Sequence, residues 1–328
     1  MSKFSILSKL VAGGLASALL AAPAIAQDLT GTLKKIKDSG TITVGHRETS
    51  VPFSYLDDKQ QPIGYSMDLC AAIVEEVKKE LMLPTLAVKY NPVTSQTRIP
   101  LMSNGTIDIE CGSTTNNLTR QKQVAFAPVT FVTGTKLLAK KSSKIKSYKD
   151  LKNKTVVITQ GTTNERTIKA LSDKDNLNIK FLAAKDHAES FLTVESGRAA
   201  AFSMDDVLLY GLIAKAKKPK DFEVIGDYLS YDPYGIMYRK NDADFGIVVN
   251  RALASLMRSG DINQIYDRWF VGKLPSGETI GMPMSPLLKA GFQLQALPEL
   301  NRFRKGESRN RFPFFLSPFL FPDVGNQK

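Results

Sequence analysis

The residues with the clearest chemical potential lie in SQTRIPLMSNGTIDIECGSTTNNLTRQKQVAF, between Ser95 and Phe126. Arg98 and Arg120 flank a run of hydroxyl and amide side chains, residues 113–117, that follows a mostly apolar segment. An arginine fork, free hydroxyls and the backbone N–H groups at the start of a helix are groups that bind carboxylates. This stretch is therefore predicted to hold an anionic ligand group, and a carboxylate in particular.

The pattern around these residues predicts a helix, a turn, a buried strand, a polar loop and a second helix. Arg98 lies near the start of the first helix, and Asn104-Gly105 ends it because both residues tolerate positive φ. Ile107 to Cys111 is the predicted strand, and Thr119 is the expected cap of the helix that Arg120 opens. In an open α/β sheet ligands bind beyond the carboxyl ends of strands, which is where the polar loop falls.

Later strands end in similar polar groups. A strand at residues 155–158 leads into TQGTTN, residues 159–164, and then into a helix, which predicts a second anion cradle. Asp186-His187 and Asp205-Asp206 each follow another predicted strand. Either Asp205 or Asp206 could face a ligand, and the pattern alone leaves this choice open.

Strands and helices alternate along the chain, which predicts an α/β fold with parallel-type sheets. The chain leaves the first α/β unit once, near residue 134, and returns once through YGIMYR, residues 234–239. We therefore expect two α/β lobes, joined by a two-strand hinge, with a ligand cleft between them. Lobe 1 is predicted to contain residues 27–133 and 237–290, and lobe 2 residues 134–236.

The N-terminus has the pattern of a signal peptide, residues 1–26. Lys3 and Lys9 precede a short run of apolar and small residues, and Ala24-Ile25-Ala26 fits a cleavage site before Gln27. The run is shorter than the ~20 apolar residues of a membrane span. We therefore predict export to the periplasm. Residues 296–328, rich in Arg, Phe and Pro without any period, are expected to form an atypical, disordered tail.

The formal net charge of +12 becomes +10 without the two lysines of residues 1–26. The lysines are scattered along the chain, and with the export signal this argues for a solvated surface and against nucleic-acid binding. The chain has no glycine motif for phosphates or dinucleotides, and its two histidines and two cysteines form no zinc motif. We therefore expect neither a cofactor nor a metal.

The two cysteines, Cys70 and Cys111, fall in a predicted helix and a predicted strand. An exported protein offers them conditions in which they could pair, but their distance cannot be read from the sequence. We favour two buried free thiols over a disulfide.

Several stretches together match a known family. They are VGHRETSVPFSY, TSQTRIPLMSNGTIDIECGSTTNNLTRQKQVAFA, TQGTTNE, AAKDHAESF and SGRAAAFSMDD. Over residues 33–290 the chain resembles the periplasmic amino-acid-binding proteins of ABC transporters, solute-binding protein family 3, which have the type II two-lobed fold. GSTTNNLTRQK, with Arg47 and His187 in place, is most similar to the glutamate/aspartate-binding branch.

The resemblance implies a set of ligand-binding residues. They are Arg47, Ser95, Arg98, Ser113, Thr115, Arg120, Thr163, His187 and Asp205. Arg120 and Thr115 would bind the α-carboxylate of the ligand, Asp205 and Ser113 its α-ammonium, and the other five its side-chain carboxylate. The resemblance also implies L-glutamate or L-aspartate as ligand, an ABC permease as partner and no catalysis. A monomer is the default expectation.

The charges of this set agree with an acidic ligand. Arg47, Arg98 and Arg120 against Asp205 give +2, whereas glutamate and aspartate each carry −1. A neutral amino acid would leave an arginine unpaired in a closed cleft, at a cost on the order of several kcal/mol. The two acidic ligands differ by one methylene group, so their ranking is left open.

Alternative interpretations remain at this point. An enzyme on the same fold, resembling cyclohexadienyl dehydratases, would need a general acid, and His187 is the one spare candidate. A binding protein for a polar amino acid such as glutamine is the other alternative. Arg47 and Arg98 could instead make surface ion pairs, and His187 could be a structural histidine.

Overall fold

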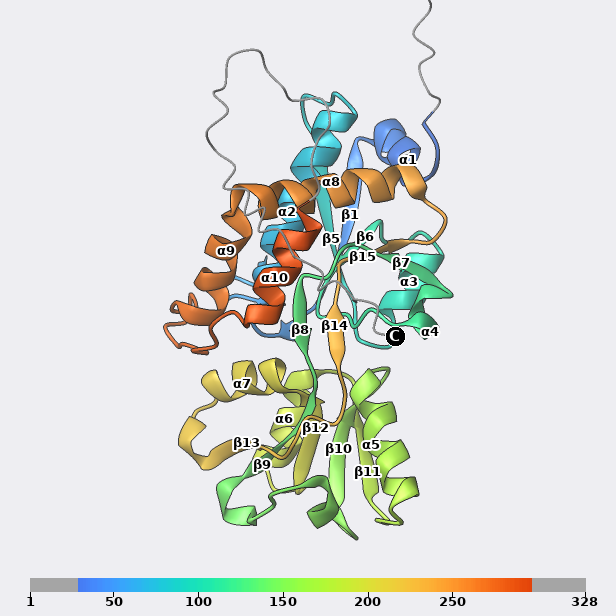
Figure 1. Cartoon of the computed structure of the whole chain (residues 1–328). Coiled ribbons are helices and arrows are strands. Elements are labelled where there is room, and N and C mark those ends of the chain that lie inside the picture. The colour runs from blue at the N-terminus through green and yellow to red at the C-terminus, as the bar shows by residue number, and fades with distance from the viewer. Residues whose placement is uncertain (1–28, 297–328) are drawn as a thin grey trace, which may run out of the picture.

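Two α/β lobes lie one above the other, joined by two neighbouring strands (Figure 1). The computed structural model describes residues 29–296, so the predicted signal peptide and, apart from Ala296, the predicted tail lie outside the described residues. Each lobe is built on a five-stranded sheet, which confirms the predicted α/β class. No helix within residues 29–296 combines the length and the apolar character needed to cross a membrane.

The sheet of the first lobe has the strand order β5-β1-β6-β15-β7. Strand β1 runs parallel to β5 and β6, whereas β15 is antiparallel to β6 and β7. The strands are β1 (Thr41–His46), β5 (Ala87–Pro92), β6 (Ile109–Cys111), β7 (Val124–Phe126) and β15 (Met237–Arg239). The helices of this lobe are α1 (Gly31–Ser39), α2 (Tyr65–Glu80), α3 (Arg98–Ser103), α4 (Leu118–Gln121), α8 (Ala243–Ser259), α9 (Asp261–Tyr266), the π-helical turn η4 (Asp267–Val271) and α10 (Pro286–Gln295).

The sheet of the second lobe repeats this arrangement in the order β11-β10-β12-β9-β13. Strand β10 is parallel to β11 and β12, and β9 is antiparallel to β12 and β13. The strands are β9 (Thr135–Lys140), β10 (Thr155–Thr159), β11 (Lys180–Ala184), β12 (Ala201–Asp205) and β13 (Phe222–Ile225). The helical segments are η1 (Lys141–Ser143), η2 (Tyr148–Leu151), α5 (Thr163–Lys174), α6 (His187–Glu195), α7 (Asp206–Ala214) and η3 (Pro219–Asp221).

The hinge is a two-stranded antiparallel ribbon of β8 (Phe131–Thr133) and β14 (Asp232–Tyr234). Strand β8 continues into β9 and β14 into β15, so each sheet receives its fourth strand, which is antiparallel to both neighbours, through the hinge (Figure 1). A small sheet of β2 (Thr49–Ser50), β3 (Ser54–Leu56) and β4 (Pro62–Ile63) completes the strands.

Aromatic packing fixes the hinge to the first lobe. The ring of Phe131, in β8, stacks on Phe270 with centroids 4.8 Å apart, and Tyr234, in β14, meets Phe53 edge to face at 5.2 Å. Aromatic pairs of this kind add about 0.5–1.5 kcal/mol each beyond the area that they bury. Both hinge strands are therefore anchored by aromatic side chains of the first lobe.

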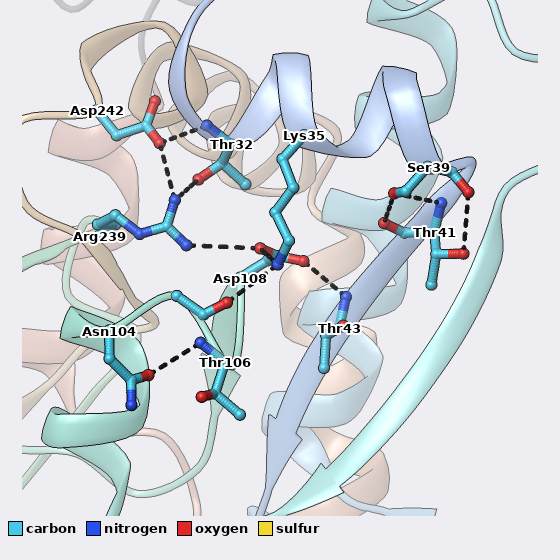
Figure 2. Close-up of polar contacts among 11 residues, drawn as sticks. Thr32, Lys35, Ser39, Thr41, Thr43, Asn104, Thr106, Asp108, Arg239 and Asp242 are labelled. Carbon is cyan, nitrogen blue, oxygen red and sulfur yellow. Dashed lines mark hydrogen bonds and ion pairs between the residues drawn. The ribbon is translucent and has the colours of Figure 1, made fainter.

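A buried carboxylate ties the returning chain to the first helix (Figure 2). The Asp108 side chain is fully buried, and it accepts from Lys35 Nζ at 2.7 Å and from the Thr43 N–H at 2.9 Å. Arg239 of β15 lies 3.6 Å from the same carboxylate. Asp242 accepts from the backbone at the start of α1 at 2.8 Å. These contacts join α1, β1, β15 and the start of α8.

The local predictions were wrong at a few points. Helix α4 is capped by Asn117, whose side-chain oxygen accepts from the Arg120 N–H at 3.0 Å, and not by Thr119. Helix α9 continues into the π-helical turn η4 at Asp267, and α10 was not predicted from the sequence.

The preference for free thiols was also wrong, because Cys70 and Cys111 form a disulfide. Helix α2 packs on β6 and brings the two Cα atoms to 6.2 Å, within the usual range for a disulfide. The bond joins residues 41 positions apart, and that proximity depends on tertiary packing which the sequence does not reveal.

Removing the disulfide should lower the stability of the folded protein. Closing a loop of this length restricts the unfolded chain, so replacing both Cys70 and Cys111 with Ala should reduce the free energy of unfolding by about 2–4 kcal/mol. Denaturant unfolding of oxidised wild type and of the double variant measures the difference. Reduced wild-type protein is the control, and equal midpoints for its oxidised and reduced forms would contradict the prediction.

Candidate functional site

A small cavity, with a volume of about 10 Å³, lies between the lobes at the carboxyl ends of β6, β10 and β12. Both lobes contribute to it, and its lining residues are Ser95, Arg98, Ser113, Thr115, Thr162, Thr163, Asn164, His187, Met204, Asp205 and Leu208. Seven of the nine site residues inferred from the sequence are in this lining. The other two contact residues of the lining, Arg47 through His187 and Arg120 through Thr115.

The Arg98 side chain forms part of the lobe 1 wall. Arg98 opens α3 and is 2% exposed, and its Nη1 donates to the Ser113 carbonyl at 3.2 Å and to Thr114 Oγ1 at 2.7 Å. Thr114 Oγ1 in turn donates to Glu110 Oε2 at 2.7 Å. The polar loop therefore holds the guanidinium in place through its backbone and through one hydroxyl.

The other two arginines contact both lobes. Arg120 Nη1 donates to the Thr115 carbonyl at 2.8 Å, and its Nη2 reaches the Gly161 carbonyl of lobe 2 at 3.4 Å. Arg47 Nη2 lies 3.5 Å from His187 Nε2 in lobe 2. Both side chains are buried. A surface ion pair is thus excluded for Arg47, and burial excludes it for Arg98 as well.

The lobes approach each other closely at Gly161, which precedes α5. Its φ is +76°, and a Cβ placed there would lie 2.7 Å from the Cα of Gln96 in lobe 1, so only glycine fits. Thr162 follows as the N-cap of α5, and its hydroxyl accepts from the Glu165 N–H. The hydroxyls of Thr163 and Thr115 meet across the cleft at 3.3 Å.

The hydrogen bonds of His187 define its protonation. An arginine can only donate, so His187 Nε2 accepts from Arg47, and Nδ1 carries the proton toward Thr159 Oγ1 at 3.1 Å. Burial, and then the charges of Arg47 and Arg98, lower the pKa of His187 well below its ordinary value. His187 is therefore neutral at pH 7 and acts as an acceptor for Arg47.

Asp205 faces the cavity and Asp206 does not. Asp205 accepts from Asn164 Nδ2 at 2.7 Å and from the Tyr234 hydroxyl. Asp206 instead accepts from the hydroxyls of Thr133 and Tyr228, both at 2.6 Å. Burial, followed by the nearby charge of Asp232, raises the pKa of Asp205 to about 7. Near neutral pH this carboxyl group can therefore gain or lose a proton.

The positive charge of the site survives its burial. Desolvation, then Arg98, lowers the pKa of Arg47 to about 10. Desolvation, then Arg98 and Arg166, lowers that of Arg120 to about 9. Both stay protonated at pH 7. Glu110, fully buried below the polar loop, opposes these shifts and was missing from the sequence-based charge count. With Glu110 included, the three arginines against two acids give +1 rather than +2.

Several polar atoms at the site have no hydrogen-bond partner among residues 29–296. They are Arg47 Nη1, Ser95 Oγ, Arg98 Nε and Ser113 Oγ. A buried donor without an acceptor costs about 1–3 kcal/mol. Since Ser95, Arg98 and Ser113 line the cavity, their free donors are suited to the oxygen atoms of an anionic ligand.

The side chains that orient the site residues were not predicted from the sequence. Asn164 and Tyr234 hold Asp205, and Thr114 and Glu110 hold Arg98. Asn164 directly follows Thr163, so its place at a helix start was a usable signal. A glutamate inside a predicted buried strand was another, because buried carboxylates require partners.

The part of the chain that the structure describes contains no group of three or more His, Cys, Asp or Glu side chains arranged to hold a metal ion.

Most of the chain matches a known protein family. The family of bacterial extracellular solute-binding proteins, family 3, matches residues 42–272. The chain belongs to this family. The resemblance inferred from the motifs is confirmed, and with it the two-lobed type II fold.

Two curated relatives are similar to this chain over nearly their whole length. The L-glutamate/L-aspartate-binding protein of Pseudomonas aeruginosa is 55% identical over 286 residues, 87% of this chain and 95% of that protein. The glutamate/aspartate import solute-binding protein of Escherichia coli is 48% identical over 290 residues, 88% and 95% respectively. Such close relatives are thus curated as solute-binding proteins.

A solved structure, an ancestral arginine-binding protein bound to glutamine, has a TM-score of 0.64 and 28% identity. The match covers 71% of this chain and 99% of that one. It supports the two-lobed architecture.

Replacing Asp205 with Asn should remove a pH dependence of stability. The folded pKa of about 7 lies above the ordinary value of 3.8, so between these values the folded protein keeps a proton that the unfolded chain has lost. Wild-type stability should therefore fall as the pH rises through this window. One pKa unit corresponds to about 1.4 kcal/mol. As the pH rises from about 4 to about 7, the free energy of unfolding of Asp205→Asn should therefore increase by on the order of a few kcal/mol relative to that of the wild type.

Urea unfolding at both pH values measures this gain. The exposed Asp173 on α5, changed to Asn, is the matched control and should follow the wild type. Parallel pH profiles for wild type and Asp205→Asn would refute the assignment of the raised pKa.

Proposed function

We propose that this protein is an extracytoplasmic solute-binding protein that captures L-glutamate or L-aspartate between its lobes and delivers it to an ABC permease. The observation that carries the proposal is the set of three buried arginines around one small interlobe cavity, with donors left free. The names of the relatives at 48–55% identity support the same ligands. Residues 1–26 would direct export to the periplasm, with cleavage near Ala26-Gln27.

The ligand's α-amino-acid group would lie between Arg120 and Asp205. Arg120 and Thr115 would bind the α-carboxylate, since both are next to the N-terminus of α5. Asp205 and Ser113 would bind the α-ammonium, because Asp205 is the carboxylate that lines the cavity. This arrangement selects α-amino acids because Arg120 complements the negative carboxylate and Asp205 the positive ammonium.

The side-chain carboxylate of the ligand would lie against Arg98 and Arg47. Ser95 and Thr163 would donate hydroxyl groups to it, and the free donors on Arg47, Arg98 and Ser95 fit this role. His187 would act through Arg47, because His187 Nε2 accepts a hydrogen bond from the Arg47 guanidinium.

The charge balance favours dicarboxylates over glutamine. A site of +1 and a ligand of −1 give a neutral complex. A neutral amino acid would leave a buried guanidinium without an anion, which is costly in a cleft that excludes water. The glutamine-binding alternative is therefore the less favoured one.

Closure of the lobes would be the signal that the permease detects. The contacts of Arg120 with Gly161 and of Thr115 with Thr163 join lobe 1 (residues 27–133 and 237–290) to lobe 2 (residues 134–236). A ligand that bridges the same surfaces would stabilise the closed form, since it gains contacts only there. A monomer is sufficient for this function.

An enzyme on this fold is the second reading, and it is the weaker one. A general acid needs a proton directed at the substrate. Both carboxylate oxygens of Asp205 accept from protein groups, and both ring nitrogens of His187 contact Thr159 or Arg47.

Arg98→Ala should abolish selective binding of acidic amino acids. Losing one partner of a buried charge pair costs about 3–5 kcal/mol, so the Kd for L-glutamate should rise by at least about a hundredfold. Calorimetric titration with L-glutamate, L-aspartate and L-glutamine measures this, after unfolding and refolding to remove any bound ligand.

The control is Arg268→Ala, which removes an arginine that is 63% exposed and pairs with Asp68. It should bind like wild type. Equal or tighter binding of L-glutamine by the wild type would refute the dicarboxylate assignment.

Binding should also release protons near neutral pH. An ammonium group beside Asp205 favours its carboxylate form, so a ligand should lower a pKa that is about 7 without it. Affinity should therefore increase as the pH rises toward about 7 and level off above it. Titrations in buffers of different ionisation enthalpy measure the released protons, and Asp205→Asn should release none. A proton count of zero for the wild type between about pH 6 and pH 7 would contradict the role of Asp205.

A further inference from the structure

Glu110 is a buried acid that no part of the proposed ligand contact uses. It lies in the middle of β6, is fully buried and does not line the cavity. Its Oε2 accepts from Thr114 Oγ1 at 2.7 Å, whereas Oε1 has no hydrogen-bond partner among the described residues. Within residues 29–296 its carboxylate therefore has a hydroxyl, and no cation, as its direct hydrogen-bond partner. A charge buried in this way is expensive and calls for an explanation.

The carboxylate lies just behind the loop that forms the lobe 1 wall. A Cβ added to Gly112 would be 2.2 Å from Glu110 Oε1 and 2.9 Å from Arg47 Cγ. Glycine at position 112 therefore lets the Glu110 carboxylate and the Arg47 side chain both pack against the backbone. The next residue, Ser113, is part of the cavity lining.

A chain of two hydrogen bonds connects Glu110 to the cavity. Arg98 Nη1 donates to Thr114 Oγ1 at 2.7 Å, and Thr114 uses its own proton to donate to Glu110. The hydroxyl thus separates the guanidinium from the carboxylate. Glu110 stabilises the charge of Arg98 without occupying the donors that a ligand would need.

The negative charge acts on the whole cluster. Glu110 raises the pKa of Arg47, of Arg98 and of Arg120, against the larger lowering caused by burial. Asp205 opposes the lowering only at Arg98 and Arg120. Glu110 is therefore placed to affect all three cations.

We infer that Glu110 is a specificity-determining residue that sets the site's net charge to +1 and thereby limits its preference for acidic over neutral amino acids. The inference rests on the proposed function and extends it to a residue outside the ligand contacts. Without Glu110 the same arginines would face the ligand with +2. Acidic ligands would then gain relative to neutral ones, because each carries one more negative charge.

Glu110→Gln tests this role. The glutamine carbonyl can still accept from Thr114, so the hydrogen-bond chain is kept and only the charge is lost. The ratio of the Kd for L-glutamine to the Kd for L-glutamate, measured by calorimetry, should rise by about tenfold over wild type. A purely structural role predicts the opposite sign, since a displaced Arg98 would discriminate less.

Three further variants isolate the effect. Glu110→Met is a second neutral variant of similar length, and it should also raise the ratio. It serves as the test if circular dichroism shows that Glu110→Gln does not fold. Glu110→Asp retains the charge and should keep the ratio near that of wild type. Glu75→Gln removes an exposed acid of α2 in the same lobe, and solvent screening should leave its ratio unchanged.

An unchanged or lower ratio in the folded neutral variants, with a normal wild type, would overturn the inference alone. A wild type without preference for L-glutamate over L-glutamine would overturn the proposed function itself. The two failures are therefore distinguishable in one set of titrations.

Discussion

The burial of three guanidinium groups at the junction of the two lobes is the constraint on which the site depends. Each arginine is removed from water, and desolvation of an ion costs several kcal/mol even after relaxation. The protein offsets this cost with carbonyl groups, one hydroxyl, one neutral imidazole and the buried acids Glu110 and Asp205. None of these partners is a direct ion pair, so the cluster stays positive and keeps donors free.

The fold makes such a cluster possible because several strand ends meet at one place. Strands β6, β10 and β12 end at the cavity, and each is followed by a polar loop or helix start. Backbone N–H groups and side-chain hydroxyls therefore converge from both lobes. The aromatic support of Phe131 and Tyr234 anchors the hinge that holds the two halves opposite one another.

Much of this arrangement could be predicted from the sequence, because the relevant signals are local. Arg98 at a helix start and Thr163 after a strand were visible as patterns, and the single excursion of the chain predicted two lobes. The cap of α4 was misassigned by two residues, since Asn117 and Thr119 are both good capping residues.

The remainder depends on distances that a sequence does not contain. The pairing of Cys70 with Cys111 follows from the packing of α2 on β6, and the choice between Asp205 and Asp206 follows from partners in the hinge. Glu110 was overlooked because a strand of apolar neighbours suggested only core packing. Its role becomes visible in the structure, where its charge raises the pKa of all three arginines.

The two sheets differ in how they are completed along the chain. All five strands of the second sheet lie between Thr135 and Ile225, whereas β7 of the first sheet pairs only with β15, which comes after the whole second lobe. A chain that is synthesised from its N-terminus can therefore complete the second sheet before β7 has a strand to pair with. During synthesis the first sheet cannot be completed until residues 237–239 have been added. The edge of β6 that pairs with β15 therefore stays open to other strands until the second lobe has been made.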